Sequence, residues 1–201
     1  MIRILLAEDQ ELVRTALATL LDLEDDFVVV ATVGRGDEVL AAVREADPTV
    51  ALVDIEMPGL DGLSVAAKLR DQHPACKVII LTTFGRPGYL RRAMEAGASG
   101  FVVKDAPAAT LGSAIRSVVN GTVVVDPALA GSALAVGTSP LTPRETEVLA
   151  AARGGTPVGE IADRLYLSEG TVRNYLSSAI AKTGARNRAG AVDRAEELGW
   201  I

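Results

Sequence analysis

Short apolar runs alternate with helical repeats through the first 120 residues, and this alternation restricts the fold more than any other feature of the chain. The apolar runs predict five buried strands, at residues 2–7, 27–33, 50–53, 78–82 and 100–103. Helical spacing follows each of them, near residues 12–21, 38–46, 62–71, 87–96 and 108–119. Strands that alternate with helices form right-handed crossovers and a parallel sheet covered on both faces. We therefore predict an α/β domain at residues 1–120, a flavodoxin-like doubly wound five-stranded parallel sheet.

The pattern changes after residue 120. Glycine and proline interrupt residues 121–139, which have little periodicity, so we predict a linker there. A capping box follows, because Thr142 can cap a helix, Pro143 takes its first position and Glu145 lies three residues after Thr142. Helical patterns then lie near residues 143–153, 158–165, 169–182 and 187–198. We expect residues 140–201 to form a small all-α domain.

The composition excludes several classes of protein. Apolar residues make up 49% of the chain, which is enough to bury a core. One cysteine, Cys76, and one histidine cannot build a disulfide framework or a zinc site of the usual ligands. The apolar run at residues 2–7 is too short for a signal peptide or a membrane span. We therefore expect a cytoplasmic protein without a membrane partner.

The formal charge of −6 lies in the first part of the chain. Residues 1–139 carry 12 Lys and Arg against 18 Asp and Glu, whereas residues 140–201 carry 8 of each. Within residues 168–190, basic residues outnumber acids. A basic cluster on a neutral domain is a modest electrostatic footprint for nucleic acid, and a solvated helix face is the alternative.

Acidic residues follow two of the predicted strands. Glu8 and Asp9 come after the first strand, and Asp54 comes after the third. Ligands of an open parallel sheet bind beyond the carboxyl ends of its strands, and crowded carboxylates repel one another unless a cation joins them. Oxygen ligands with open positions suit Mg²⁺. Lys104 and Thr82, which end two further strands, would supply a positive charge and a hydroxyl for phosphoryl transfer to Asp54.

Each of these residues alone has an ordinary explanation. A strand-end acid is commonly a helix cap, a strand-end lysine is commonly solvated, and threonine favours strands. The specific signal is their conjunction at the ends of the first, third, fourth and fifth strands.

The first domain resembles, over its whole length, the receiver domains of two-component response regulators. The resemblance is carried by Ala7-Glu-Asp9, Asp54-Ile-Glu-Met-Pro-Gly59, Leu81-Thr-Thr83 and Gly97-Ala-Ser-Gly-Phe-Val-Val-Lys104. It implies that Asp54 accepts phosphate from the phosphohistidine of a sensor histidine kinase. It also implies a magnesium site formed by Asp9, Asp54 and the Glu56 carbonyl, with Glu8 acting through water. Lys104 and Thr82 would contact the phosphoryl group.

Three positions depart from the commoner receiver pattern. Glu8 replaces Asp, which lengthens the side chain without removing the site. Phe101 takes the switch-aromatic position that is often Tyr, and Asp105 follows Lys104 where many receivers have Pro.

The resemblance also implies a conformational switch. Phosphate on Asp54 would draw in the Thr82 hydroxyl and free space for Phe101 to turn inward, which reshapes the surface of residues 84–107. The alternative is that Phe101 is an ordinary core aromatic.

The second domain contains a helix, a turn and a second helix at residues 157–182. Ser168 can cap the second helix sharply. An outward Arg can pair with guanine edges and an outward Asn with adenine edges in a major groove, while basic residues near the helix end, including Arg186, would meet phosphates. The predicted DNA contacts are Thr171, Arg173, Asn174, Ser177, Lys182 and Arg188. A generic helical hairpin is the alternative.

This domain resembles the LuxR-type helix-turn-helix of the NarL/FixJ response regulators over nearly all of residues 140–201. The matching segments are Leu141-Thr-Pro-Arg-Glu-Thr-Glu-Val-Leu149, Glu160-Ile-Ala, Leu167-Ser and Gly170-Thr-Val-Arg-Asn-Tyr175. One departure is Lys182-Thr-Gly184, where the family usually has an apolar residue after the lysine, so we expect Gly184 to end the recognition helix. Details at residues 23–26, 82–89, 171–175 and 198–200 are similar to DesR-like regulators of membrane-lipid desaturation.

The resemblances together imply a transcription factor that is switched by phosphorylation of Asp54 and dimerises when phosphorylated. Its implied partners are a sensor histidine kinase, double-stranded DNA, a second copy of the chain and, as a further candidate, RNA polymerase. The predicted dimer surfaces are Leu12, Val13, Ala16 and Leu20 with Leu111, Ile115 and Val118, and Val192, Ala195 and Leu198 near the chain end.

Two other functions fit parts of the chain. A phosphohydrolase with an aspartyl-phosphate intermediate would need an acid close to its nucleophile, commonly as Asp-x-Asp after the first strand, whereas Asp54 heads Asp-Ile-Glu after the third. A DNA-binding protein whose first domain is only an unphosphorylated docking module would have no need of Asp9, Asp54, Thr82 and Lys104 together. We therefore expect that the protein is not an enzyme, and that its first domain catalyses only its own phosphoryl transfer and dephosphorylation.

Overall fold

The computed structural model of the chain describes residues 1–83, 87–126, 129–130 and 139–201. The chain divides into two compact units, and the division along the chain falls after Ala130. Within the described residues, no helix combines the length and the apolar character that crossing a membrane requires.

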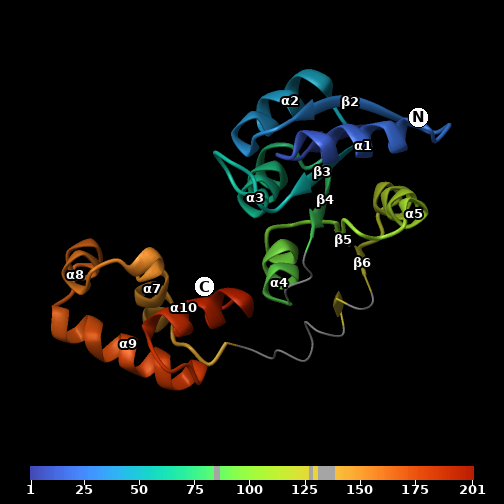
Figure 1. Ribbon diagram of the computed structural model, residues 1–201. Helices are drawn as coiled ribbons and strands as arrows, with labels where there is room; N and C mark the ends of the chain where they lie inside the picture. The colour runs from blue at the N-terminus through green and yellow to red at the C-terminus, as the bar shows by residue number, and fades with distance from the viewer. Residues whose placement is uncertain (84–86, 127–128, 131–138) are drawn as a thin grey trace. The chain divides into compact units, whose positions relative to one another are not determined.

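The N-terminal unit is built around a parallel sheet (Figure 1). Its strands, within the described residues, are β1 (Ile2–Ala7), β2 (Phe27–Val33), β3 (Val50–Asp54), β4 (Lys77–Thr82), β5 (Gly100–Val103) and β6 (Val124–Val125). The helices are α1 (Glu11–Asp22), a short 3₁₀ turn η1 (Gly36–Glu38), α2 (Val39–Ala46), α3 (Gly62–Gln72), α4 (Pro87–Glu95) and α5 (Ala108–Val119). The strand order is β2-β1-β3-β4-β5-β6, so the chain changes direction across the sheet between β1 and β3. The predicted doubly wound α/β fold is confirmed.

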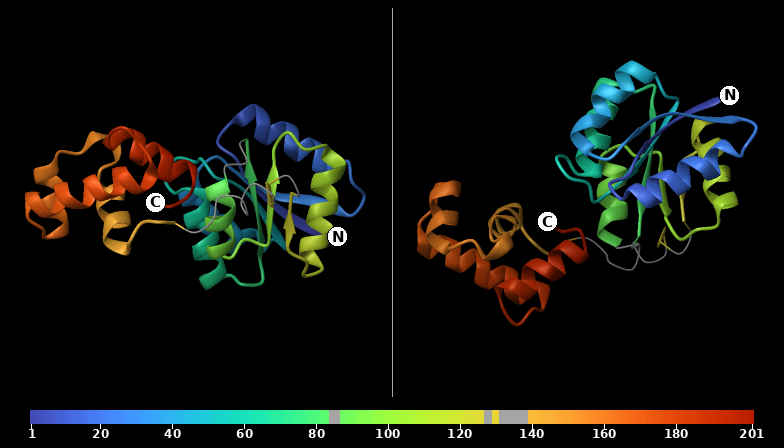
Figure 2. Two further views of the ribbon diagram at one scale, coloured as in Figure 1. Left: turned by 90° about the horizontal axis from the view of Figure 1, so that it is seen from below. Right: turned by 45° about the horizontal axis from the view of Figure 1, so that its top comes forward.

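Both faces of this sheet are buried, because successive apolar side chains of each strand point to opposite faces. Ile4 and Leu6 of β1 and Ile79 and Leu81 of β4 share one apolar core with Ile115 of α5. The strand residues between them are also buried, as expected for a parallel sheet with helices on both sides. Figure 2 shows α1 and α5 on one side of the sheet and α3 and α4 on the other.

The structure adds a strand to the five that the sequence predicts. Val124 and Val125 form β6, which pairs in parallel with Gly100 and Phe101 of β5. The predicted linker at residues 121–139 is therefore partly ordered as the edge of the sheet. Two residues are too short for a strand periodicity to be recognised, which explains the miss. Most of the rest of that linker, residues 127–128 and 131–138, lies outside the described residues.

The C-terminal unit is all-α. Its helices are α7 (Pro143–Ala151), the 3₁₀ turn η2 (Arg153–Gly155), α8 (Val158–Leu165), α9 (Glu169–Thr183) and α10 (Arg188–Glu197). They enclose a core that includes Leu149, Ile161, Val172 and Ala191.

Local sequence signals fix the helix ends of this unit. Thr142 and Glu145 form the predicted capping box at the start of α7. The Ser168 side chain accepts the Thr171 N–H at the start of α9, and Gly184, with φ of 68°, ends that helix in the left-handed conformation. These three predictions are confirmed.

Candidate functional site

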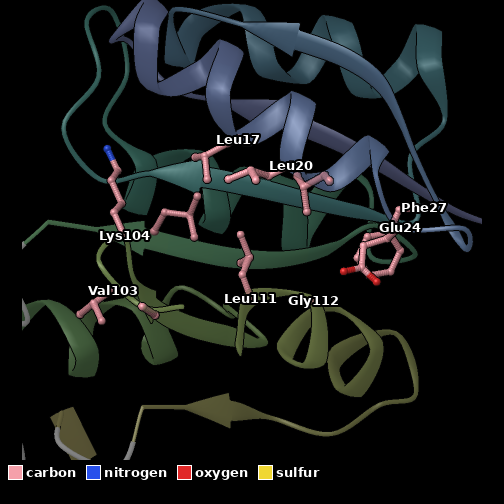
Figure 3. A pocket seen from close by; sticks show the side chains of 11 residues that line it. Leu17, Leu20, Glu24, Phe27, Val103, Lys104, Leu111 and Gly112 are labelled. Atoms are coloured by element: carbon pink, nitrogen blue, oxygen red, sulfur yellow. The ribbon is translucent and has the colours of Figure 1, made fainter. Parts of the chain in front are cut away.

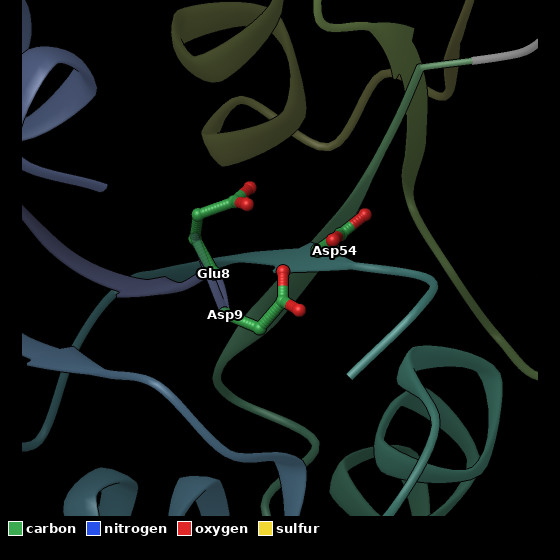
Figure 4. A group of neighbouring side chains, drawn as sticks. All are labelled: Glu8, Asp9 and Asp54. Carbon is green, nitrogen blue, oxygen red and sulfur yellow. The ribbon is translucent and has the colours of Figure 1, made fainter. Parts of the chain in front are cut away.

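Three carboxylates meet where the strand order reverses. Ala7 of β1 pairs with Val53 of β3, so Glu8 and Asp54 leave the sheet from adjacent positions. One carboxylate oxygen from each of Glu8, Asp9 and Asp54 lies within 4.8 Å of the other two. Figure 4 shows the three side chains directed toward one another. The predicted acidic cluster is present at the carboxyl edge of the sheet.

Lys104 brings a positive charge into this cluster. Its Nζ lies 2.6 Å from Glu8 Oε2 and 2.9 Å from Asp54 Oδ2. The lysine follows β5, and its backbone N–H donates to the Thr82 carbonyl at 2.7 Å, which fixes it beside the end of β4. The side chains of Lys104, Glu8 and Asp54 are 9%, 0% and 7% exposed, so water screens these ion pairs weakly.

Burial and charge act against each other on these groups. Loss of solvation raises the pKa of Glu8 and of Asp54 above their ordinary values, although Lys104 opposes the shift. Burial disfavours the Lys104 charge, but contacts with Glu8 and Asp54 outweigh it and raise the pKa of the ammonium. The lysine therefore stays charged at neutral pH and stabilises the carboxylate form of Asp54.

The donor set fits a hard divalent cation. Three carboxylates stand against one ammonium, so two negative charges are left over when all three acids are ionised. Glu8 Oε2 is buried and has no hydrogen-bond partner within the described residues. Its contact with Lys104 is an ion pair whose angles do not meet those of a hydrogen bond. Asp9 is exposed and leaves the cluster open to solvent. All the available ligands are oxygens, the type that Mg²⁺ prefers.

Three other predicted site residues lie nearby. Glu56 follows Asp54 by two residues on the loop after β3, and its carbonyl as a ligand stays a prediction. Thr82 is buried at the end of β4. Phe101 is 0% exposed in β5, so its side chain is already inside in this conformation and a rotation inward would have to start from another one. Of the predicted switch surface, residues 84–86 lie outside the described residues.

Arg14 was not among the predicted site residues, and it holds the turn that carries two of the acids. Its guanidinium donates to the backbone carbonyls of Glu8 at 2.6 Å and Asp9 at 3.4 Å. Gly34 leaves room for the Arg14 guanidinium, because a Cβ at residue 34 would lie 3.2 Å from Arg14 Nη1, which is closer than an ordinary contact. The sequence signal that could have identified it is an arginine in the first turn of a helix that comes shortly after two acidic residues.

The helix-turn-helix is present in the second unit. The side chains of Arg173, Asn174 and Ser177 are exposed on α9, as predicted, and Thr171 is partly buried beside the Ser168 cap. Arg173 also pairs with Glu169 of the same helix at 2.5 Å.

The other two predicted DNA contacts already bind protein groups. Lys182 Nζ lies 2.7 Å from Glu145 Oε2. Arg188 donates to the carbonyls of Thr156 at 2.8 Å and Gly155 at 3.0 Å, which joins α10 to the turn before α8. The role of Lys182 and Arg188 as phosphate contacts stays a prediction.

Exposure is compatible with only part of the predicted dimer surfaces, and which residues form a dimer stays a prediction. Leu12 and Leu20 of α1 are 83% and 46% exposed, which suits an interface. Ile115, Val118 and Ala195 are 0% exposed because they belong to the two cores, so they offer no surface to a second chain in this structure.

An apolar cavity of about 100 Å³ lies between α1 and α5 (Figure 3). Leu17 and Leu20 of α1 and Leu111 of α5 line it, and Lys104 lines one end. The lysine that holds Glu8 and Asp54 therefore also borders the α1–α5 side of the sheet.

Comparisons with known proteins agree with this geometry. Residues 4–116 match the family model of the response regulator receiver domain, and residues 139–195 match that of the bacterial regulatory proteins of the luxR family. In Bacillus subtilis, the uncharacterized transcriptional regulatory protein YvfU is 47% identical and the transcriptional regulatory protein DesR 46% identical over 201 residues, which is all of both chains in each case. The crystal structure of the response regulator ChrA, from a heme-sensing two-component system, is similar with a TM-score of 0.60 at 32% identity, covering 100% of this chain and 98% of that one.

Proposed function

This chain belongs to the two-component response regulators that join a receiver domain to a LuxR-type DNA-binding domain, and from that membership we propose that phosphorylation of Asp54 controls its binding to DNA. The chain is a DNA-binding transcriptional regulator of a two-component system.

Asp54 is the phosphoacceptor in this proposal. One of its carboxylate oxygens forms a bond to phosphorus while the phosphorus–nitrogen bond of a kinase phosphohistidine breaks, and the electron pair stays on the imidazole nitrogen. Lys104 supports this role because its Nζ, 2.9 Å from Asp54 Oδ2, can neutralise charge on the incoming phosphoryl oxygens. The buried Thr82 hydroxyl, at the end of the neighbouring strand, would donate to one of those oxygens. The chain catalyses only this transfer to itself and the later loss of its own phosphate.

Asp9, Asp54 and the Glu56 carbonyl would hold Mg²⁺, with Glu8 acting through water. When bound, Mg²⁺ supplies positive charge that compensates the phosphoryl oxygens. Arg14 contributes by fixing the backbone of Glu8 and Asp9, so the carboxylates are aligned before the cation arrives.

Phosphorylation would favour a dimer that places two α9 helices in successive major grooves of double-stranded DNA. Arg173, Asn174 and Ser177, exposed on α9, and Thr171 would contact the DNA. The exposed Leu12 and Leu20 of α1 support this helix as part of the dimer surface.

A sensor histidine kinase would be the upstream partner, and RNA polymerase would be a further one. A DNA target implies a cytoplasmic location.

The single observation that carries the proposal is the contact of the Lys104 ammonium with the Asp54 carboxylate inside a cluster of three acids. Beryllofluoride with Mg²⁺, a stable mimic of the phosphoryl group, tests it. We expect it to increase the dimer fraction in sedimentation and the affinity for DNA that the protein selects from a random-sequence pool. If both quantities stay unchanged, the proposed mechanism is wrong.

A further inference from the structure

Glu145 is a buried carboxylate that the phosphorylation site does not use. Its side chain is 6% exposed. Its Oε1 accepts a hydrogen bond from Ser178 Oγ at 2.5 Å, and its Oε2 lies 2.7 Å from Lys182 Nζ. The Oε2 atom also accepts the Thr142 N–H at 2.6 Å, which closes the capping box of α7. One carboxylate therefore joins the first turn of α7 to α9.

The two contacts on α9 are spaced to control its rotation. Ser178 and Lys182 are four residues apart, so they lie on the same face, one turn from each other. Attachment at two points along one face opposes rotation of the helix about its axis. Arg173 and Ser177 lie on the neighbouring, exposed face, and the exposed Asn174 lies one turn before Ser178. A small rotation of α9 would move these side chains away from the base edges that they are proposed to contact.

Resting on the proposed DNA contacts, we propose that Glu145 is a positioning residue for DNA recognition. It sets the rotation of α9 through Ser178, and it keeps Lys182 as an internal counter-ion. Lys182 is consequently not one of the cations that neutralise DNA phosphates, contrary to the expectation from sequence.

Salt dependence separates the two roles of Lys182. Each phosphate that a protein neutralises releases a counterion, so log K falls against log salt with a slope of about −0.9 per contact. Loss of a phosphate contact would reduce this slope by about 1, whereas loss of an internal ion pair leaves it unchanged. Loss of Glu145, in contrast, frees Lys182 for phosphates and makes the slope steeper.

The experiment measures binding of the full chain to two 30-base-pair duplexes across a range of salt. One duplex has random sequence, and the other is selected by the wild-type protein from a random pool. The variants are Lys182→Met, Glu145→Gln and Ser178→Ala. Arg186→Met is the matched control, because Arg186 is exposed just beyond α9 and loses the same charge. Circular dichroism verifies that each variant is folded.

For Lys182→Met we expect an unchanged salt slope on the random duplex and about a tenfold loss of preference for the selected duplex, the scale of one or two lost recognition contacts. Ser178→Ala, which changes no charge, should lose preference in the same direction by a smaller factor. Glu145→Gln should lose preference while its slope becomes steeper by up to about 1. Arg186→Met should reduce the slope instead.

Two results would overturn the inference. One is a Lys182→Met slope reduced as in Arg186→Met, which would make Lys182 a phosphate contact. The other is an unchanged preference in folded Glu145→Gln and Ser178→Ala, which would make Glu145 a stabilising residue only. Failure of the proposed DNA contacts looks different, because folded Asn174→Ala would then keep the wild-type preference.

Discussion

Lys104 reaches past the end of β4 to place its Nζ 2.9 Å from the carboxylate of Asp54, although β3 and β5 are not neighbours in the sheet. The same Nζ contacts Glu8 at 2.6 Å. The carboxylate that would accept a phosphoryl group is therefore paired with a cation in the unphosphorylated chain. Loss of this cation should therefore have opposite effects on the two processes: Mg²⁺ binding should become stronger and phosphorylation slower.

Replacement of Asp54 by Asn should abolish covalent labelling. The amide keeps the shape of the side chain but lacks the nucleophilic carboxylate oxygen. We expect incubation with radiolabelled acetyl phosphate and Mg²⁺ to give background signal for Asp54→Asn. Glu56→Gln is the matched control, because Glu56 is exposed on the same loop and only its carbonyl is assigned a role. Its labelling should stay within a factor of about two of wild type, and persistent labelling of Asp54→Asn would show that another residue accepts the phosphate.

Replacement of Lys104 by Met should strengthen Mg²⁺ binding and slow phosphorylation. Without the ammonium, three carboxylates within 4.8 Å of one another have no internal cation, so a divalent ion is attracted more strongly. The phosphoryl oxygens lose their charge partner, which costs on the order of a hundredfold in rate for a comparable electrostatic contact. Isothermal titration with Mg²⁺ and acetyl phosphate labelling measure the two effects. Lys104→Arg, which keeps the charge, should retain wild-type metal affinity, and weaker Mg²⁺ binding in Lys104→Met would contradict the prediction.

Truncation of Ile161 should unfold the DNA-binding domain without disturbing phosphorylation. Ile161 is 0% exposed in the C-terminal core, and its replacement by Ala leaves a cavity that costs about 3 kcal/mol. A domain of this size has a stability of only a few kcal/mol. We expect lost DNA binding, a changed fluorescence of Trp200, the single tryptophan of the chain, and normal labelling of Asp54. The exposed neighbour in Glu160→Gln should change none of these, and loss of labelling in Ile161→Ala would show that the two units fold together.

The sequence predicted most of the fold because periodicity and helix caps are local. Short apolar runs located the first five strands, and Thr142, Ser168 and Gly184 marked helix ends through contacts within a few residues. The strand β6 has only two residues, and such a segment has no period to recognise.

The candidate site was predictable where strand order alone brings residues together. Carboxyl ends of parallel strands meet at one edge, so Glu8, Asp54 and Lys104 could be grouped from their positions after strands. Partnerships across the all-α domain were not predictable in this way. Lys182 and Glu145 are 37 positions apart on different helices, and helix packing, not sequence spacing, decides that they meet. Likewise, an apolar stripe on a helix does not tell whether residues such as Ile115 face the core or a second chain.

The Glu145 carboxylate should make the stability of the C-terminal domain depend on acid. Burial opposes its charge, but hydrogen bonds from Lys182, Ser178 and Thr142 outweigh burial and lower its pKa to about 2, from 4.5 in an unfolded chain. A carboxyl group whose pKa is lower in the folded state contributes stability that is complete above the unfolded pKa and is lost as pH falls toward the folded pKa. The contribution should therefore be full above about pH 5 and lost between about pH 5 and 2.

Urea unfolding followed by Trp200 fluorescence at several pH values measures this, because Trp200 packs against the C-terminal core. Other carboxyl groups also titrate in this range, so the test is the difference between wild type and Glu145→Gln. That difference should be largest at neutral pH, because the glutamine leaves Lys182 without its partner, and should shrink steadily as the pH falls toward 2. A difference that stays constant from pH 7 to pH 3 would mean that Glu145 is not held as a carboxylate by Lys182 and Ser178.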